Sequence, residues 1–358
     1  MTSRSTSAKH APAKHASEKR APRGRVTYFD WLRGAATIAV VVLHMFNKML
    51  TDHTVAELGV PMVLVWTELQ LLLTRWAVPF FLMITGALLL NPARQQSWKK
   101  IFRYVFRMIC VLLVFCPIYT CMSARGISIA AIVDGLGKAV TQGSWDHLWY
   151  VYALIGLYLL TPALSIYVRA ATHEQQRSVL LMLAVTTLCI PTFNYATLAG
   201  VVNFVWVTSS LFYYLLGSYA HRFLRLDARV RLAGLGSCAL AAAGIAFVVC
   251  VQYRYPKWLI RPECPLVAAW SLYLFLLAKT HLDGRQAPKP LALTSSLSLA
   301  VYLLHPLPLI VLYRRLWWMP YQTLPPVIFE LVVLAIVLGV SIPAAMLLKR
   351  VPGLRKIL

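Results

Sequence analysis

Residues 28–50 read YFDWLRGAATIAVVVLHMFNKML, and this stretch decides the fold. A transmembrane helix needs about 20 mainly apolar residues, so the stretch is long enough to cross a bilayer. It nevertheless carries Asp30, Arg33 and His44. A charged side chain at the bilayer centre costs roughly 2.5–3.5 kcal/mol, so such residues normally face a cavity or a partner. The stretch therefore predicts a membrane helix with one polar, functional face.

The composition of the whole chain is that of a membrane protein. Of its 358 residues, 59% are apolar (AVILMFWYC) and 13% are charged, against about 45–50% and 25% in soluble domains. The mean hydropathy is +0.66. A single soluble core of this size cannot bury so much apolar surface, which excludes a water-soluble fold. The length also excludes a large catalytic domain outside the membrane.

Ten apolar segments predict an all-α polytopic membrane protein, with about ten transmembrane helices around a polar shaft. The segments are 28–50, 60–90, 103–122, 147–168, 178–198, 202–220, 232–252, 265–280, 291–313 and 326–348. Residues 1–27 are basic and lack an apolar run, so we expect a disordered cytosolic tail followed by one transmembrane domain, 28–358. The segment 60–90 is too long for one straight crossing, and we expect it to bend at Pro79 or to begin outside the lipid.

The charges predict the orientation of the chain. Lys and Arg number 35 and Asp and Glu number 12. With the N-terminus inside, 25 of the basic residues fall on the cytosolic side and 8 on the outer side. This asymmetry predicts that both termini are cytosolic. The basic clusters lie between apolar runs and the aromatic residues lie within them, so we expect the lipid bilayer as a partner and no nucleic acid.

Helical spacing predicts a polar column along the first span. Arg33 and His44 are 11 residues apart, so they share one face and lie about 16–17 Å apart along the axis. Asp30 is placed to pair with Arg33. His305 lies about as deep in its own span as His44 does, so the two imidazoles should meet. The alternative is that Arg33 reaches the inner headgroups and His44 is a packing residue.

Further polar residues extend this column. The cations that enter the third span would lie toward the cytosol and suit a phosphorylated ligand. As an alternative, these cations only anchor the helix, and Glu68 and Arg75 form a structural ion pair. No metal site is expected. The additional residues are Glu68, Arg75, Lys99, Lys100, Arg103, Arg107, His147 and Glu330.

Several motifs, taken in order, resemble those of acyltransferase family 3, integral-membrane O-acyltransferases, over about 28–350. The first is Tyr28-Phe-Asp30-Trp-Leu-Arg33-Gly34 with His44, similar to the family's Arg-x10-His signature. The others are Arg75-Trp-Ala-Val-Pro79-Phe-Phe81-Leu-Met-Ile-Thr85-Gly86, the basic entry to the third span, His147-Leu-Trp149-Tyr-Val-Tyr152, Tyr213-Tyr214-Leu-Leu-Gly217 and Val301-Tyr302-Leu-Leu-His305-Pro306. The chain is most similar to the single-domain branch that includes the O-acetyltransferase of enterobacterial common antigen. It differs in carrying Thr85 where Ser is common.

The resemblance implies a bacterial cytoplasmic (inner) membrane enzyme that moves an acetyl group from cytosolic acetyl-CoA to a hydroxyl of an outward-facing glycan or lipid-linked saccharide. His44 would be the general base, or alternatively would carry the acetyl group, and Asp30 would orient Arg33. Coenzyme A would be held by Arg33, Lys99, Lys100, Arg103 and Arg107. The acceptor side would comprise Glu68, Arg75, His147, Trp149, Tyr152, His305 and Glu330. A secondary transporter or exporter is the main alternative, and a membrane-embedded sensing module is a third.

Overall fold

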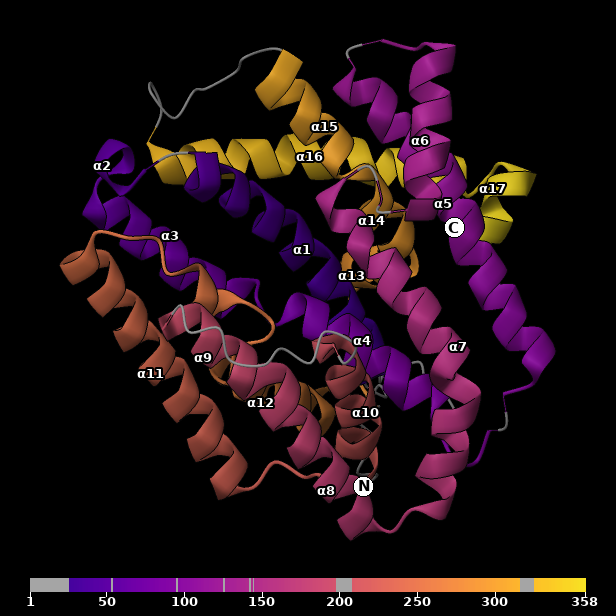
Figure 1. Ribbon diagram of the computed structural model, residues 1–358, viewed down its shortest axis with the longest axis vertical. Coiled ribbons are helices and arrows are strands. Elements are labelled where there is room, and N and C mark those ends of the chain that lie inside the picture. Colours follow the sequence, from indigo (N-terminus) through magenta and orange to yellow (C-terminus); the bar gives the residue numbers. More distant parts are fainter. Residues whose placement is uncertain are drawn as a thin grey trace, which may run out of the picture.

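The structure is a computed structural model that describes residues 26–358 except 53, 95, 125, 142, 144, 198–207 and 316–324. Within this part of the chain every regular element is a helix (Figure 1). The α-helices are α1 (Tyr28–Asp52), α2 (Val55–Leu58), α3 (Val60–Leu73), α4 (Ala77–Leu89), α5 (Trp98–Ser123), α6 (Ile129–Thr141), α7 (Trp149–Ala170), α8 (His173–Ala184), α9 (Ile190–Thr197), α10 (Ser209–Arg222), α11 (Ala228–Gln252), α12 (Pro265–Leu282), α13 (Lys289–Ser296), α14 (Ser298–Leu304), α15 (Pro306–Ile310), α16 (Pro326–Leu348) and α17 (Pro352–Ile357). Short 3-10 or π-helical turns are η1 (Asp146–Leu148), η2 (Val185–Cys189), η3 (Lys257–Ile260) and η4 (Val311–Arg315).

The described helices confirm the predicted all-α, multi-pass architecture. Eight stretches are long and apolar enough to cross a membrane, and a bent pair of helices brings the number to nine. The sequence predicts ten. The difference lies at 202–220, because 202–207 are outside the described residues and the rest of that segment forms α10, which is only 14 residues long. The predicted tail also lies outside the described residues, except for its last two positions.

Two of the predicted spans are broken. The segment 60–90 is interrupted at 74–76, between α3 and α4, and not at Pro79 as predicted. Pro79 is the third residue of α4, where a missing N–H costs no intrahelical hydrogen bond, so it is compatible with a helix start. The segment 291–313 is not one straight span either, because α13 and the helix that follows it meet at 71°. Leu297 separates α13 from α14.

Helix α1 is the central element of the fold. The side chains of its first half, such as Tyr28 and Leu32, belong to one buried apolar cluster with α4, α10 and α12. Those of its second half, such as Val41 and Met45, belong to another with α5, α7, α11 and α14. Figure 1 shows α1 running through the middle of the molecule and α16 lying crosswise in its upper part. A polar residue on α1 is therefore enclosed by other helices.

Small residues allow α4 and α10 to touch through their backbones. A Cβ added at Gly86 would lie 1.8 Å from the carbonyl oxygen of Tyr214, and one added at Gly217 would lie 2.0 Å from that of Met83. Side chains cannot occupy such gaps, so glycine is required at both positions for this approach. These two glycines belong to motifs quoted above, and their role is helix packing.

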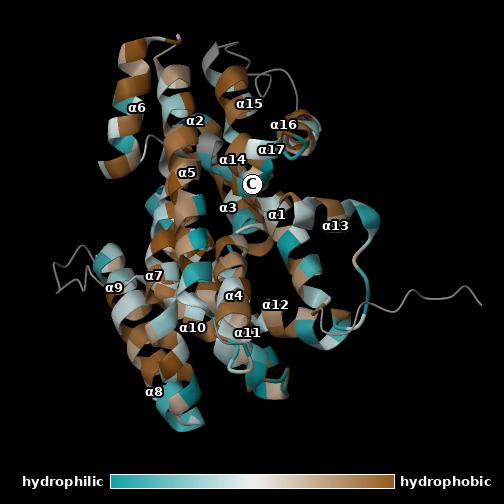
Figure 2. Cartoon of the chain, turned by 90° about the vertical axis from the view of Figure 1, so that its right-hand side faces the viewer, coloured by the Kyte–Doolittle hydropathy of each residue, from teal (hydrophilic) through white to brown (hydrophobic). Residues whose placement is uncertain are grey.

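The helix ends carry polar caps. Thr172 and Gln175 form a capping box at the start of α8, and Asp227 accepts a hydrogen bond from the backbone N–H of Val230 at the start of α11. Such caps satisfy N–H groups that the helix leaves unpaired. Figure 2 shows hydrophobic residues over much of α5 and α6, and hydrophilic residues at the start of α8 and around the turn between α12 and α13.

Candidate active site

A cavity of about 450 Å³ lies at the centre of the helix bundle. Its walls come from helices α1, α4, α5, α7, α13 and α14 and from η1. Lys349, before α17, and Leu358, after it, complete the walls. Arg33 and His44 both line it. The prediction that an 11-residue spacing places these two groups on one face of the helix is confirmed, and the function of this face stays a prediction. The lining also includes cations, imidazoles, hydroxyl groups and several aromatic rings, but none of the described side chains that line it is acidic.

Three cations from distant parts of the chain line the cavity: Arg33 of α1, Arg107 of α5 and Lys349, which directly follows α16. Arg107 donates a hydrogen bond through Nε to the backbone oxygen of Ile357, at 2.8 Å. The ammonium group of Lys349 donates to the backbone oxygen of Ser296. Burial and the charge of Arg107 lower the pKa of Lys349, as expected for a cation placed beside another cation. The cavity thus has the electrostatics of an anion site.

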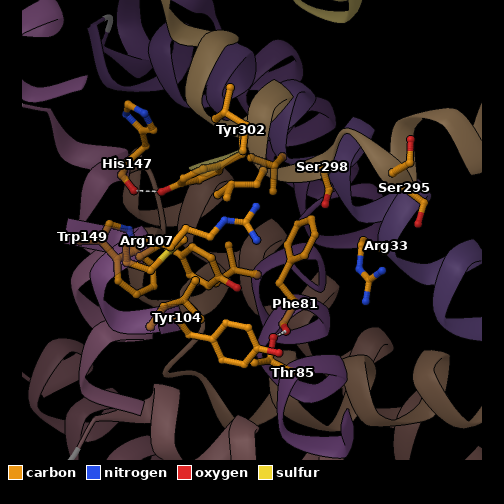
Figure 3. Close-up of a pocket in the computed structure, with 18 of the residues that line it drawn as sticks. Arg33, Phe81, Thr85, Tyr104, Arg107, His147, Trp149, Ser295, Ser298 and Tyr302 are labelled. Atoms are coloured by element: carbon orange, nitrogen blue, oxygen red, sulfur yellow. Dashed lines mark hydrogen bonds between the residues drawn. The ribbon is translucent and has the colours of Figure 1, made fainter. Parts of the chain in front are cut away.

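Aromatic and hydroxyl groups surround these cations. Figure 3 shows Arg107 and Arg33 entering from opposite sides, with Phe81 between them in this view and Ser295 and Ser298 on the side of Arg33. Tyr104, Trp149, Tyr150, Tyr158, Tyr302, Thr85 and Ser296 complete this set. Pockets with mostly aromatic walls and a few polar groups are typical of small-molecule sites.

The position of Arg33 depends on close packing of α1 against α13. A Cβ added at Gly34 would lie 2.4 Å from the backbone oxygen of Leu291, so only glycine permits this contact. The hydroxyl of Ser295 donates to Oδ1 of Asp30 at 3.3 Å across the same junction. Asp30 itself does not line the cavity, and its ion pair with Arg33 stays a prediction.

His44 and His305 are hydrogen-bonded side by side. Nδ1 of His44 lies 2.8 Å from the backbone oxygen of Val40 and 3.3 Å from Nε2 of His305. The ring of His305 is completely buried, and its Nδ1 lies 3.2 Å from the backbone oxygen of Val301. The prediction that the two imidazoles share one depth is therefore confirmed. His305 stands behind His44 and does not line the cavity.

His147 is a third imidazole at this place. Its ring centroid lies 6.2 Å from that of His44 and 5.9 Å from that of His305. It is 2% exposed, yet neither ring nitrogen has a hydrogen-bond partner among the described residues. Burial and, to a smaller extent, the charge of His44 lower the pKa of His147 well below its usual value, so the ring is neutral near pH 7. Its backbone oxygen accepts a hydrogen bond from the hydroxyl of Tyr302 (Figure 3).

The other cations predicted on α5 lie outside the cavity. Lys99, Lys100 and Arg103 are exposed on the first two turns of this helix, one or more turns before Arg107. The ammonium group of Lys100 lies 5.8 Å from the centroid of the Tyr104 ring, and Tyr104 does line the cavity. The structure thus brings one of the four predicted α5 cations into the site, and whether the others bind a ligand stays a prediction.

Glu68 and Arg75 are not brought to the cavity: Glu68 lies on α3, and Arg75 lies within the break between α3 and α4. Arg75 is buried, and its guanidinium group donates hydrogen bonds to neutral side chains: Gln70, Asn47 at 2.7 Å and Tyr255 at 3.5 Å. This set does not include Glu68. Arg75 therefore ties the break in the chain to α1 and to the residues after α11.

Tyr152 and Glu330 also lie away from the cavity. The hydroxyl of Tyr152 donates to the backbone oxygen of Ala139 at 2.8 Å, which fastens α6 to α7. Glu330 is 5% exposed on α16, and neither carboxylate oxygen has a partner among the described residues. By contrast Trp149, which was predicted from the same motif as Tyr152, lines the cavity and is 47% exposed.

Sequence reasoning missed several lining residues. Lys349 is one of the 25 basic residues expected on the cytosolic side, and nothing in its sequence neighbourhood marks it as a ligand. Tyr150 and Tyr302 stand within the quoted motifs, so the motifs were a signal for them, whereas Ser295 and Ser296 carry none. In the part of the chain that the structure describes, no group of three or more His, Cys, Asp or Glu residues is placed to hold a metal ion.

Comparison with known proteins provides independent information on this site. Residues 26–346 match the family model described as an acyltransferase domain. No curated protein and no solved structure matches the chain. The match spans nearly all of the described helices, including every helix that contributes to the cavity. The chain therefore belongs to acyltransferase family 3, and it is a multi-pass membrane acyltransferase.

Proposed function

We propose that the protein is an O-acetyltransferase that moves an acetyl group from cytosolic acetyl-CoA to a hydroxyl of an outward-facing glycan or lipid-linked saccharide. The observation that carries this proposal is that Arg33, Arg107 and Lys349 share one cavity with His44. Family membership disfavours the transporter and the sensing module as alternatives. The excess of basic residues predicted on the cytosolic side supports a bacterial cytoplasmic membrane with both termini inside.

The three cations would hold the phosphate groups of coenzyme A. Guanidinium groups bind phosphate oxygens through paired N–H donors, and an ammonium group adds a compact charge. Nε of Arg107 is engaged by Ile357, so its terminal nitrogens are the atoms that a phosphate would meet. Lys99, Lys100 and Arg103 would act earlier, because exposed cations attract a polyanion toward the site without contacting it in the cavity.

The separation of the cations from His44 matches the shape of an extended thioester donor. Eleven residues of helix place Arg33 and His44 about 16 Å apart along α1. In acetyl-CoA the pantetheine arm likewise separates the phosphates from the thioester. The phosphates would therefore lie at the Arg33 end, and the thioester would reach the level of His44. The contact between Ser295 and Asp30 would keep α1 and α13 in register at the phosphate end.

His44 would act as the general base of the transfer. Its imidazole takes the proton from the acceptor hydroxyl, and the oxygen forms a bond with the carbonyl carbon of the thioester. The carbon–sulfur bond then breaks, the electron pair stays on the sulfur, and the imidazolium returns its proton to the thiolate. The products are the O-acetylated acceptor and free coenzyme A. A positioned base typically contributes 10²–10⁴-fold to such a step.

His147 and Trp149 are the proposed acceptor-side residues. The neutral ring of His147 offers one donor and one acceptor atom that no described residue occupies, which supports a hydrogen bond to the incoming hydroxyl or to the carbonyl oxygen. Trp149 offers a partly exposed apolar face to the acceptor. Glu68, Arg75, Tyr152 and Glu330 are left out of this proposal because none of them lines the cavity.

The donor half of the proposal is tested by binding of coenzyme A to the purified protein in detergent, measured by calorimetry. Arg33→Ala should weaken binding about 10- to 100-fold, the value of a hydrogen bond to a charged group. Arg350→Ala is the matched control, because Arg350 is an exposed arginine just after α16, next to Lys349, and lies outside the cavity. Equal affinity in wild type and Arg33→Ala contradicts the donor site.

The transfer half is tested with inverted membrane vesicles and radiolabelled acetyl-CoA, followed by counting label in the glycolipid and polysaccharide fractions. His44→Ala should abolish labelling, and His281→Ala, an exposed residue in the last turn of α12, should not. Labelled protein that accumulates without an acceptor would indicate an acetyl group carried on His44 instead of base catalysis. Full labelling in the His44→Ala vesicles would refute the role of this residue.

A further inference from the structure

The geometry points to His305 as a positioning residue, which holds His44 with its proton on Nδ1 and its lone pair on Nε2. This inference rests on the proposed function, and it gives His305 a different role from the acceptor contact predicted from the sequence. His305 is completely buried and does not line the cavity, so it can act on a substrate only through another residue.

The hydrogen bonds around the two rings determine where each proton lies. A backbone oxygen can only accept, so Nδ1 of His44, 2.8 Å from the oxygen of Val40, carries a proton. The same reasoning assigns a proton to Nδ1 of His305, 3.2 Å from the oxygen of Val301. In a neutral ring the other nitrogen then has a lone pair. Nε2 of His305, 3.3 Å from Nδ1 of His44, is therefore an acceptor for the same N–H that Val40 accepts.

This arrangement prepares His44 for proton transfer. The N–H of His44 has two acceptors on one side of its ring, which fixes the plane of the ring and leaves Nε2 as the basic atom. When Nε2 takes the acceptor's proton, the Nδ1–H becomes a stronger donor, and both acceptors stabilise the resulting cation. In many hydrolases a carboxylate orients the catalytic histidine. Here a neutral imidazole would do so.

The hydroxyl groups around His305 support this role because neither of them competes for its Nε2. The titratable residues that face it are His44 of α1, His147 of η1 and Tyr302 of its own helix, with Tyr119 of α5 behind them. The hydroxyl of Tyr302 donates to the backbone oxygen of His147, and that of Tyr119 donates to the backbone oxygen of Leu303. Both hydroxyl groups are thus directed elsewhere.

The local backbone explains why His305 is held firmly. His305 lies between α14, which ends at Leu304, and α15, which begins at Pro306. The oxygen of Val301 accepts the backbone N–H of His305 at 2.9 Å as well as the ring Nδ1–H. Main chain and side chain of His305 are therefore fixed to one carbonyl group. A proline directly after the residue further restricts its backbone.

The first test reads the protons directly by ¹⁵N NMR of histidine-labelled protein in detergent, with His305→Gln and His44→Ala used to assign the signals. Both rings should carry their proton on Nδ1, and the signal of Nε2 in His305 should change when His44 is removed. A proton on Nε2 of His305 overturns the inference. This measurement needs no transfer activity, so it is separate from a failure of the proposed function, which His44→Ala tests.

The second test compares His305→Leu with His305→Gln in the labelling assay. Leu removes the acceptor, so kcat should fall about 10- to 100-fold, the effect of losing one hydrogen bond to a charged group, with coenzyme A affinity unchanged. Gln places an oxygen near the position of Nε2 and should restore part of kcat. A wild-type kcat in His305→Leu overturns the inference. Equal loss in both variants, or loss of coenzyme A binding, indicates a merely structural residue and also overturns it.

Discussion

Replacement of Lys349 by Gln tests whether a residue that the sequence did not single out belongs to the donor site. Lys349 lines the cavity, and its ammonium group already donates one hydrogen bond to the backbone oxygen of Ser296. A hydrogen bond between charged partners contributes about 1.5–3 kcal/mol, and the lower end applies to a half-buried group. We therefore expect the affinity for coenzyme A to fall about tenfold in Lys349→Gln.

The pH dependence of binding makes this test specific. Burial and Arg107 lower the pKa of Lys349 in the free protein, and a bound phosphate raises it again because the charged form gains a partner. Affinity is then complete below the lowered pKa and decreases as the pH rises through it. Above about pH 7 the phosphates themselves are fully ionised. Wild-type affinity should thus decline as the pH rises through this lowered pKa, before the ordinary lysine range of about 10.4 is reached, and Lys349→Gln should lack this decline.

The assay is calorimetric titration of coenzyme A into detergent-solubilised protein at several pH values and constant ionic strength. Arg350→Gln is the matched control, because it removes the same charge from the next, exposed residue. It should change the affinity by less than about twofold, since an exposed charge outside the site is screened by salt. If Lys349→Gln and Arg350→Gln weaken binding equally, the effect of Lys349 is only one of net charge, and its place in the donor site is refuted.

Two further predictions concern packing and the third imidazole. Gly86→Ala should lower the free energy of unfolding, measured by thermal unfolding, by about 1–3 kcal/mol, because the new Cβ would meet the backbone oxygen of Tyr214. Gly156→Ala on α7 is the control and should change it little, because a Cβ there meets nothing within 4 Å. Equal stability of the two variants would show that α4 and α10 can separate without cost. The lowered pKa of His147 keeps this ring neutral, so His147 should add no step to the acid limb of the kcat/KM profile, and the slope of that limb should not exceed one; a slope of two would mean that His147 also titrates.

The sequence could predict the features that follow from helix geometry alone. The shared face of Arg33 and His44 follows from 3.6 residues per turn, and the shared depth of His44 and His305 follows from a fixed rise per residue. The first prediction needs only that one segment is helical, and the second also needs the two segments to cross the membrane in the same direction. The all-α architecture follows in the same way from the length of the apolar runs.

The remaining features depend on where helices cross, which a single sequence does not specify. Lys349 reaches the cavity at the end of α16, which lies crosswise to α1 in the view of Figure 1, and Ser295 reaches it next to the 71° turn between α13 and the helix that follows. Glu68 lies on α3, before the break at 74–76, and its helix does not contribute to the cavity. The rise per residue predicts the depth of Glu68 in its span, but it does not predict which neighbouring helices its side chain faces.

The glycine-mediated contact between α4 and α10 has a consequence for motion during turnover. Two backbones in direct contact cannot slide past one another without collision, because no flexible side chain separates them. We therefore expect these two helices to move as one rigid unit whenever the enzyme admits donor or releases product. Any movement that admits a ligand to the cavity must then come from elements on its other walls. Spin labels on α4 and α10 should keep a constant separation with and without coenzyme A.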